Sequence, residues 1–124
     1  MTVVGMFDIS KYTNKTCSST EVILFLERKQ HILEHHPEVA KYLNCIPNIL
    51  KYPDCIFWEI NRESTIWLVK KFDKNIKLTV KLNFSQNKNL KNSIIQMQIM
   101  RESEVDRNIR NGNIIKLFDK NNPI

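Results

Sequence analysis

The sequence predicts an α+β domain, in which two N-terminal helices pack on one face of a roughly four-stranded antiparallel sheet. Apolar residues recur at helical spacing over residues 26–50, whereas residues 55–99 alternate between apolar and polar side chains. Short turns separate the alternating segments, which favours antiparallel neighbours. A chain of 124 residues supports one modest core, so we expect a single domain over residues 1–124.

The N-terminal part predicts a short strand, a polar loop, a second brief strand and the first helix. Residues 3–7 are apolar and begin with two valines, which favours a strand. Val22-Ile23 predicts the second strand. From about Leu26 the apolar positions follow the helical period as far as His36.

Pro37 predicts the start of the second helix, because a first helical turn has no partner for the N–H that proline lacks. His36 marks the boundary between the helices, since a residue before proline avoids the α region. Pro47 predicts a kink or break near residues 44–46. The apolar stripe of this second helix comprises Val39, Tyr42, Leu43, Ile46, Ile49 and Leu50.

The second half predicts the sheet. Alternating segments occupy residues 55–60, 66–71, 76–84 and 94–100, residues 101–110 are compatible with a helix, and residues 114–118 suggest a last strand. The clearest alternation places Ile76, Leu78, Val80 and Leu82 opposite Lys77, Thr79 and Lys81. We expect the apolar stripe to face the helices together with Ile95, Met97 and Ile99. Gln96 and Gln98 would then lie beside the lysines on an open face.

The charge distribution suggests a nucleic-acid partner. Residues 1–60 hold six basic and seven acidic side chains, whereas residues 61–124 hold thirteen basic and six acidic ones. A basic half is typical of a nucleic-acid-binding surface, although a solvated lysine-rich face would give the same count. Three widely spaced cysteines do not suggest disulfides, and no signal peptide or membrane span is evident. We therefore expect a cytoplasmic protein without a membrane partner.

The residues for metal-independent cleavage of RNA are present. Such a reaction needs a base for the 2′-OH proton, an acid for the leaving oxygen and cations for the phosphorane. Histidine suits the proton transfers because its pKa lies near neutrality. The candidates are His31, His35 and His36 on the first helix and Lys77, Thr79, Lys81, Gln96 and Gln98 on the sheet. A plainer interpretation makes His36 a helix cap, His31 a core residue and the lysines a solvated strand face.

We expect no metal and no cofactor. His31 and His35 stand one helical turn apart, but the glutamate and the third ligand of a zinc hydrolase do not follow them. No phosphate-binding loop or dinucleotide motif occurs in the sequence.

Two segments resemble the phage-associated branch of the barnase/EndoU/colicin/RelE-like nuclease superfamily. The first reads His31-Ile32-Leu33-Glu34-His35-His36-Pro37-Glu38, and the second reads Ile49-Leu50-Lys51-Tyr52-Pro53-Asp54. Val3-Val4-Gly5 and Asn92-Ser93-Ile94-Ile95 also fit the family outline. The late strand departs from it, because Gln96-Met97-Gln98 stands where the family usually carries a threonine. Either glutamine takes over phosphate binding or this copy has lost catalysis.

The resemblance implies an endoribonuclease toxin that attacks with the 2′-OH and leaves a 2′,3′-cyclic phosphate. It implies His31 and His36 as acid and base, and the chemistry of the sheet residues leads us to add Lys81 to the catalytic residues. His35, Lys77, Thr79, Gln96 and Gln98 would contact the substrate. The partners would be RNA, with tRNA among the candidates, and an antitoxin or immunity protein. Two alternatives stay open: an inactive nucleic-acid-binding or inhibitor module, and a protein-binding module anchored by an exposed Trp58 or Trp67.

Overall fold

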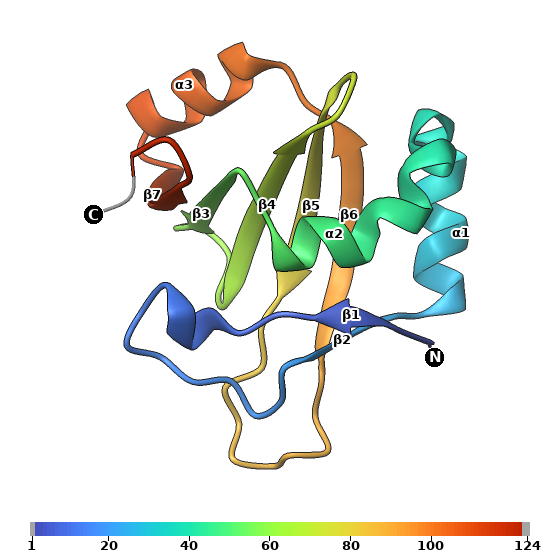
Figure 1. Cartoon of the computed structure of the whole chain (residues 1–124), viewed down its shortest axis with the longest axis vertical. Coiled ribbons are helices and arrows are strands. Elements are labelled where there is room, and N and C mark those ends of the chain that lie inside the picture. Colours follow the sequence, from blue (N-terminus) through green and yellow to red (C-terminus); the bar gives the residue numbers. More distant parts are fainter. Residues whose placement is uncertain (1, 123–124) are drawn as a thin grey trace.

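A computed structural model describes residues 2–122, which form one mixed sheet of seven strands with three α-helices and two 3-10 helices (Figure 1). The strands are β1 (Thr2–Met6), β2 (Glu21–Leu24), β3 (Cys55–Glu59), β4 (Thr65–Lys71), β5 (Asn75–Lys81), β6 (Asn92–Ile99) and β7 (Ile114–Asp119). The helices are η1 (Ile9–Lys11), α1 (Leu26–His35), η2 (Pro37–Cys45), α2 (Ile46–Lys51) and α3 (Glu102–Arg110).

The predicted architecture, two N-terminal helices on a roughly four-stranded antiparallel sheet, is wrong. The strand order is β1-β2-β6-β5-β4-β3-β7, so the expected β3–β6 meander forms only the middle of the sheet. At one edge β2 runs parallel to β6, and at the other edge β7 joins β3. Two of the three α-helices directly follow strands: α1 follows β2, and α3 follows β6. Pairings between distant segments leave no local signal in the sequence, which is why the edges were missed.

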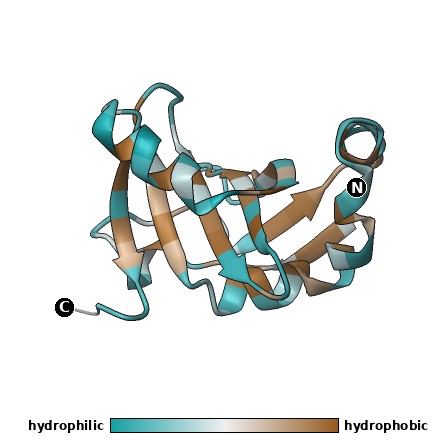
Figure 2. Cartoon of the chain, turned by 90° about the horizontal axis from the view of Figure 1, so that it is seen from above, coloured by the Kyte–Doolittle hydropathy of each residue, from teal (hydrophilic) through white to brown (hydrophobic). Residues whose placement is uncertain are grey.

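The main core lies between the sheet and the helices α1, η2 and α2, on what we call the helix face of the sheet. Ile66, Leu68, Ile76, Leu78 and Val80 are all fully buried there. The opposing side chains come from Ile32 of α1, Val39 and Tyr42 of η2, and Ile46, Ile49 and Leu50 of α2. The predicted orientation of the β5 stripe is therefore confirmed. Figure 2 shows the alternation as brown and paler bands along the central strands.

The second face of the sheet carries a smaller apolar cluster, which α3 covers in part. Phe57, Trp67, Val69, Met100 and Ile114 are buried together, and Val105 of α3 packs against them. The second face is therefore not open over its whole width, contrary to expectation. This face carries both polar and apolar side chains, and the short helix α3 packs against part of it.

The prolines divide the helical segment as predicted. α1 ends at His35, and His36 is the residue that precedes η2, with Pro37 in its first turn. The chain then passes from 3-10 to α geometry at Cys45 and Ile46, where the sequence predicted a break at Pro47. The sequence predicted one second helix, and the structure has two short helices there, η2 and α2.

Gly5 permits the close approach of β1 to α2. A Cβ atom built at Gly5 would lie 2.7 Å from Cδ1 of Leu50 and 3.4 Å from the Cα of Pro47. Leu50 is 2% exposed, so its side chain has little room to move. The register shift in the β1–β2 pairing falls beside this glycine, between Val3 and Gly5.

We expect Gly5→Ala to lower the free energy of unfolding by about 1–2 kcal/mol, because the added methyl group overpacks a filled site. In a Leu50→Ala background the clashing atom is gone, so the same substitution should cost much less. Chemical denaturation of the four proteins of this double-mutant cycle measures the difference. Equal costs in both backgrounds would contradict the close approach.

Candidate active site

The pairing of β4, β5 and β6 brings the predicted sheet residues together on the second face. Lys77 lies opposite Val69 on one side and Gln98 on the other. In the next row, Thr79 lies between Trp67 and Gln96. The predicted proximity of Gln96 and Gln98 to the β5 lysines is therefore confirmed for this part of the sheet.

A β-bulge in β6 produces this arrangement. Val80 pairs with Ile94 but Thr79 pairs with Gln96, so Ile95 is the extra residue. Ile94, at 1% exposure, takes the core position that was predicted for Ile95. The prediction for Ile95 is thus wrong, whereas Met97 and Ile99 pack with the main core as expected. The extra residue keeps both glutamines on the side of Lys77.

Lys77 is the most unusual side chain of this face. It is 6% exposed, and its Nζ lies 4.0 Å from the centre of the Trp67 ring. Among residues 2–122, no hydrogen bond or ion pair engages this nitrogen. Burial lowers the pKa of Lys77, an effect that nearby Glu104 and Glu59 oppose and Arg62 reinforces. Lys77 therefore loses its proton at a lower pH than an exposed lysine does.

Glu59 and Arg62 support the Trp67 ring on which Lys77 rests. Arg62 holds the Glu59 carboxylate with Nε–Oε1 at 2.8 Å and Nη2–Oε2 at 2.9 Å. The indole Nε1 of Trp67 donates to Oε2 of the same carboxylate at 3.0 Å. Sequence reasoning missed these two residues. The sequence did contain a signal for this ion pair: Glu59 ends a strand on the same side as Phe57, and Arg62 follows three residues later in the adjoining turn.

Unused polar groups surround Lys77. Nε2 of Gln96 donates to Oε1 of Gln98 at 2.8 Å, which leaves the Gln98 amide nitrogen available as a donor. Thr79 is completely buried, and its hydroxyl has no hydrogen-bond partner within residues 2–122. A buried polar group without a partner is rare and costly. The late strand β6 carries no threonine after its paired isoleucines, but Thr79 of β5 places a hydroxyl directly beside Gln96.

Lys81 lies at the exposed end of the same strand. Its Nζ donates to the carbonyl oxygen of Glu63 at 2.5 Å, and the residue pairs with Thr65 and Ser93. Lys81 therefore reaches the β3–β4 turn rather than the Trp67 ring. Lys77 and Lys81 lie on the same face of β5, but Lys77 is buried and Lys81 is exposed.

The histidines occupy a different part of the molecule. The rings of His31 and His35 are exposed on α1 with their centres 4.3 Å apart, and Nδ1 of His35 lies 3.0 Å from the His31 carbonyl oxygen. Nδ1 of His36 lies 3.2 Å from Oε1 of Glu38. α1 inserts Ile32 into the main core of the helix face, whereas Lys77 rests on the second face. A groove shared by Lys81 and a histidine stays a prediction.

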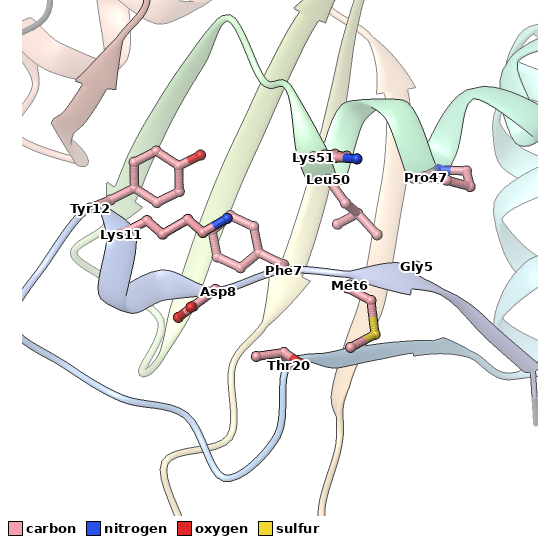
Figure 3. A pocket seen from close by; sticks show the side chains of 10 residues that line it. All are labelled: Gly5, Met6, Phe7, Asp8, Lys11, Tyr12, Thr20, Pro47, Leu50 and Lys51. Carbon is pink, nitrogen blue, oxygen red and sulfur yellow. The ribbon is translucent and has the colours of Figure 1, made fainter.

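A separate hollow of about 450 Å³ lies between β1, η1 and α2 (Figure 3). Lys11, Lys51 and Asp8 border it, but none of the predicted site residues does. Oδ1 of Asp8 accepts hydrogen bonds from the Ser10 hydroxyl and backbone amide, which lower the pKa of Asp8. This carboxylate therefore caps η1. Its geometry is explained by local structure.

Among residues 2–122, no group of three or more His, Cys, Asp or Glu side chains is arranged to hold a metal ion. In the same residues, none of the helices has the length and apolar character needed to cross a membrane. Trp67 is 7% exposed, so it does not offer the exposed anchor that a protein-binding module would need.

Residues 3–95 match the family described as phage-Barnase-EndoU-ColicinE5/D-RelE like nuclease 3. The match covers most of the chain, and the chain belongs to this family of phage-associated nucleases. No curated protein and no solved structure matches it. α3 and β7 lie beyond the matched residues.

The buried amine gives a prediction about stability. Because burial lowers the pKa of Lys77 in the folded state, the unfolded chain binds the extra proton between the folded pKa and about 10.4. The stability of the wild type relative to Lys77→Met should therefore rise as the pH increases through this window. Denaturant unfolding of both proteins at a series of pH values measures it. A difference that falls with pH would mean that the native site favours the charged amine.

Proposed function

We propose that this protein is an endoribonuclease that cleaves RNA by attack of the 2′-OH, with Lys77 as the proton acceptor. The observation that carries the proposal is Lys77, a residue only 6% exposed, whose amine rests on Trp67 without a hydrogen-bond or ion-pair partner among residues 2–122. Enzymes lower the pKa of a lysine by burial when it must act as a base. The family match supports a nuclease. Lys77 supplies a group that can accept the proton in the cleavage step.

The proposed reaction is a transesterification within the RNA. The neutral amine of Lys77 takes the 2′-OH proton, and the 2′ oxygen attacks the adjacent phosphorus. The bond from phosphorus to the 5′ oxygen breaks as the Lys81 ammonium, after its Nζ has left the Glu63 carbonyl oxygen and turned toward Lys77, gives a proton to that oxygen. The products are a 2′,3′-cyclic phosphate and a 5′-hydroxyl. Side chains carry both protons, so the scheme uses no cofactor and no metal.

One donor near Lys77 suits the charged phosphorane. The amide nitrogen of Gln98 makes no hydrogen bond among residues 2–122, and Gln96 fixes its oxygen. Arg62 is held by Glu59 and the Thr79 hydroxyl is buried, so these two groups support the site from beneath and do not contact the phosphate. Donors arranged before the reaction stabilise developing charge without reorganisation. Glutamine thus takes the part of the threonine that the late strand lacks.

The histidines of α1 are the second candidates for the proton transfers. The family resemblance assigns acid and base to His31 and His36, with His35 in contact with the substrate. RNA that passed from the second face around the part of β6 that β2 does not pair, beyond Asn92 and Ser93, would meet them, since α1 packs against β6.

A toxin role in the cytoplasm completes the proposal. RNA, including tRNA, would be the substrate, and an antitoxin or immunity protein would neutralise the activity in the producing cell. An inactive RNA-binding or inhibitor module is the competing function on the same surface. Cleavage assays separate the two directly.

We expect Lys77→Arg to reduce the cleavage rate by about a hundredfold or more, because arginine stays protonated and cannot accept the 2′-OH proton. RNA binding should change little. Denaturing gels of a labelled single-stranded RNA measure cleavage, and fluorescence anisotropy with a 2′-deoxy analogue measures affinity. Lys74→Gln is the matched control on an exposed turn lysine and should cleave normally. A fully active Lys77→Arg variant would contradict the assignment.

A second variant locates the remaining proton transfer. If His36 is the acid or base that the resemblance implies, His36→Ala should lose about a hundredfold in rate and stop the toxicity of the expressed protein. Growth curves and RNA integrity in cells expressing wild type or variant measure this. Loss of cleavage in His36→Ala while Lys77→Arg stays active would move the chemistry to α1. Equal growth and intact RNA with the wild type would remove the enzyme altogether.

A further inference from the structure

A second hollow, of about 550 Å³, lies at the β3–β4 turn, where its aromatic wall belongs to the helix face and its Glu59 and Arg62 belong to the network under Trp67. Two partly buried aromatic rings form its apolar wall, those of Trp58 and Phe84, with their centres 6.3 Å apart. Lys15 reaches over both rings, with Nζ 5.5 Å from the Trp58 ring and 5.6 Å from the Phe84 ring. None of these residues takes part in the proposed proton transfers.

The hollow is held in shape by hydrogen bonds from three segments. Ser64 has a positive φ of 55°, and its carbonyl oxygen accepts from the backbone N–H of Leu82 at 2.7 Å. The loop that carries Lys15 is attached beside Phe84, because the Ser18 backbone N–H donates to the Asn83 carbonyl oxygen at 2.9 Å. A wall fixed on both sides is arranged before a ligand binds, which lowers the entropy cost of binding.

The charges around the hollow favour a neutral aromatic ligand. Lys15 and Arg62 are balanced by Glu59 and Glu63, and Arg62 is already held by Glu59. A phosphate would gain little from this balanced set. A nucleobase, by contrast, can stack on aromatic rings and can place its polar edge against carboxylates and hydroxyls.

The position of the hollow connects it to the scissile phosphate. Glu59 and Arg62 line it on one side and hold Trp67 beneath Lys77 on the other. Glu63 also lines it, and the carbonyl oxygen of Glu63 accepts from Lys81. RNA whose scissile phosphate lies at Lys81 would pass over the end of the sheet at this turn to place its neighbouring nucleotide in the hollow, whose aromatic wall is on the helix face.

We propose that the Trp58–Phe84 hollow binds one unpaired nucleobase next to the scissile phosphate, and so directs the enzyme to single-stranded RNA. The inference rests on the proposed function for the location of the phosphate. A base inside a duplex is stacked on its neighbours and paired, so it would not enter the hollow. Lys15 would close over the bound base from the solvent side.

The test compares two short probes of equal length and charge, an oligodeoxynucleotide and a fully abasic deoxyribose-phosphate chain. Both lack the 2′-OH and are not cleaved. Phe84→Leu should weaken binding of the probe with bases by about tenfold and leave the abasic probe unchanged, because stacking is lost and phosphate contacts are kept. Fluorescence anisotropy at one fixed salt concentration measures both affinities.

Two further variants make the comparison specific. Lys15→Gln, on an exposed side chain, should also weaken only the probe with bases, without a change in thermal stability. Tyr52→Leu removes an exposed aromatic ring outside the hollow and should change neither affinity. Equal affinity of wild type and Phe84→Leu for the probe with bases, or equal weakening of both probes by Phe84→Leu, would overturn the base site.

The outcomes also separate this site from the proposed function. Selective weakening without any RNA cleavage by the wild type would reject the nuclease mechanism and keep the base site. RNA cleavage at an unchanged rate by Phe84→Leu and Lys15→Gln, on single-stranded and duplex RNA alike, would reject the base site and keep the mechanism.

Discussion

The alternation along β5 is the constraint on which the rest of the structure depends. Its apolar residues lie on the floor of the core that α1, η2 and α2 cover, and every second residue points to the other face. A slip of β5 by one residue against its neighbours would move Lys77 and Lys81 into the apolar core and bring Leu78 and Val80 out. Burial of unpaired charge costs several kcal/mol, so the register is firmly selected.

This register forces a compromise on the second face, because that face is itself partly buried. Phe57, Trp67 and Val69 form a cluster that α3 covers, and Lys77 lies at its margin. The cation over the Trp67 ring and the field of Glu59 and Glu104 recover part of the hydration that burial removes. They do not recover all of it, since the pKa of Lys77 is still lowered. A lysine held in this way adds little to the stability of the fold, and it is the residue that we propose as the proton acceptor.

The sequence was informative wherever a local pattern decides the structure. The start of α1 at Leu26, the break before Pro47 and the orientation of β5 follow from periodicity and from proline chemistry. The parallel contact of Val22 with Asn92 does not, because it joins segments seventy residues apart without a turn between them. The bulge at Ile95 also escaped, since Ile94 and Ile95 are both apolar and either can fill the core position.

The candidate site follows the same division. Lys77, Thr79, Gln96 and Gln98 could be placed together because one alternating strand and its neighbour decide their positions. The Glu59–Arg62–Trp67 network could not be predicted. It depends on which residues of β3 and β4 pair with each other, and so on which side chains share one face of the sheet. Burial of Lys77 was missed because it depends on the cluster at α3, which is distant in the sequence and outside the family match. The residues of the nuclease scaffold are therefore readable from local patterns, whereas the environment that lowers the Lys77 pKa arises from tertiary contacts.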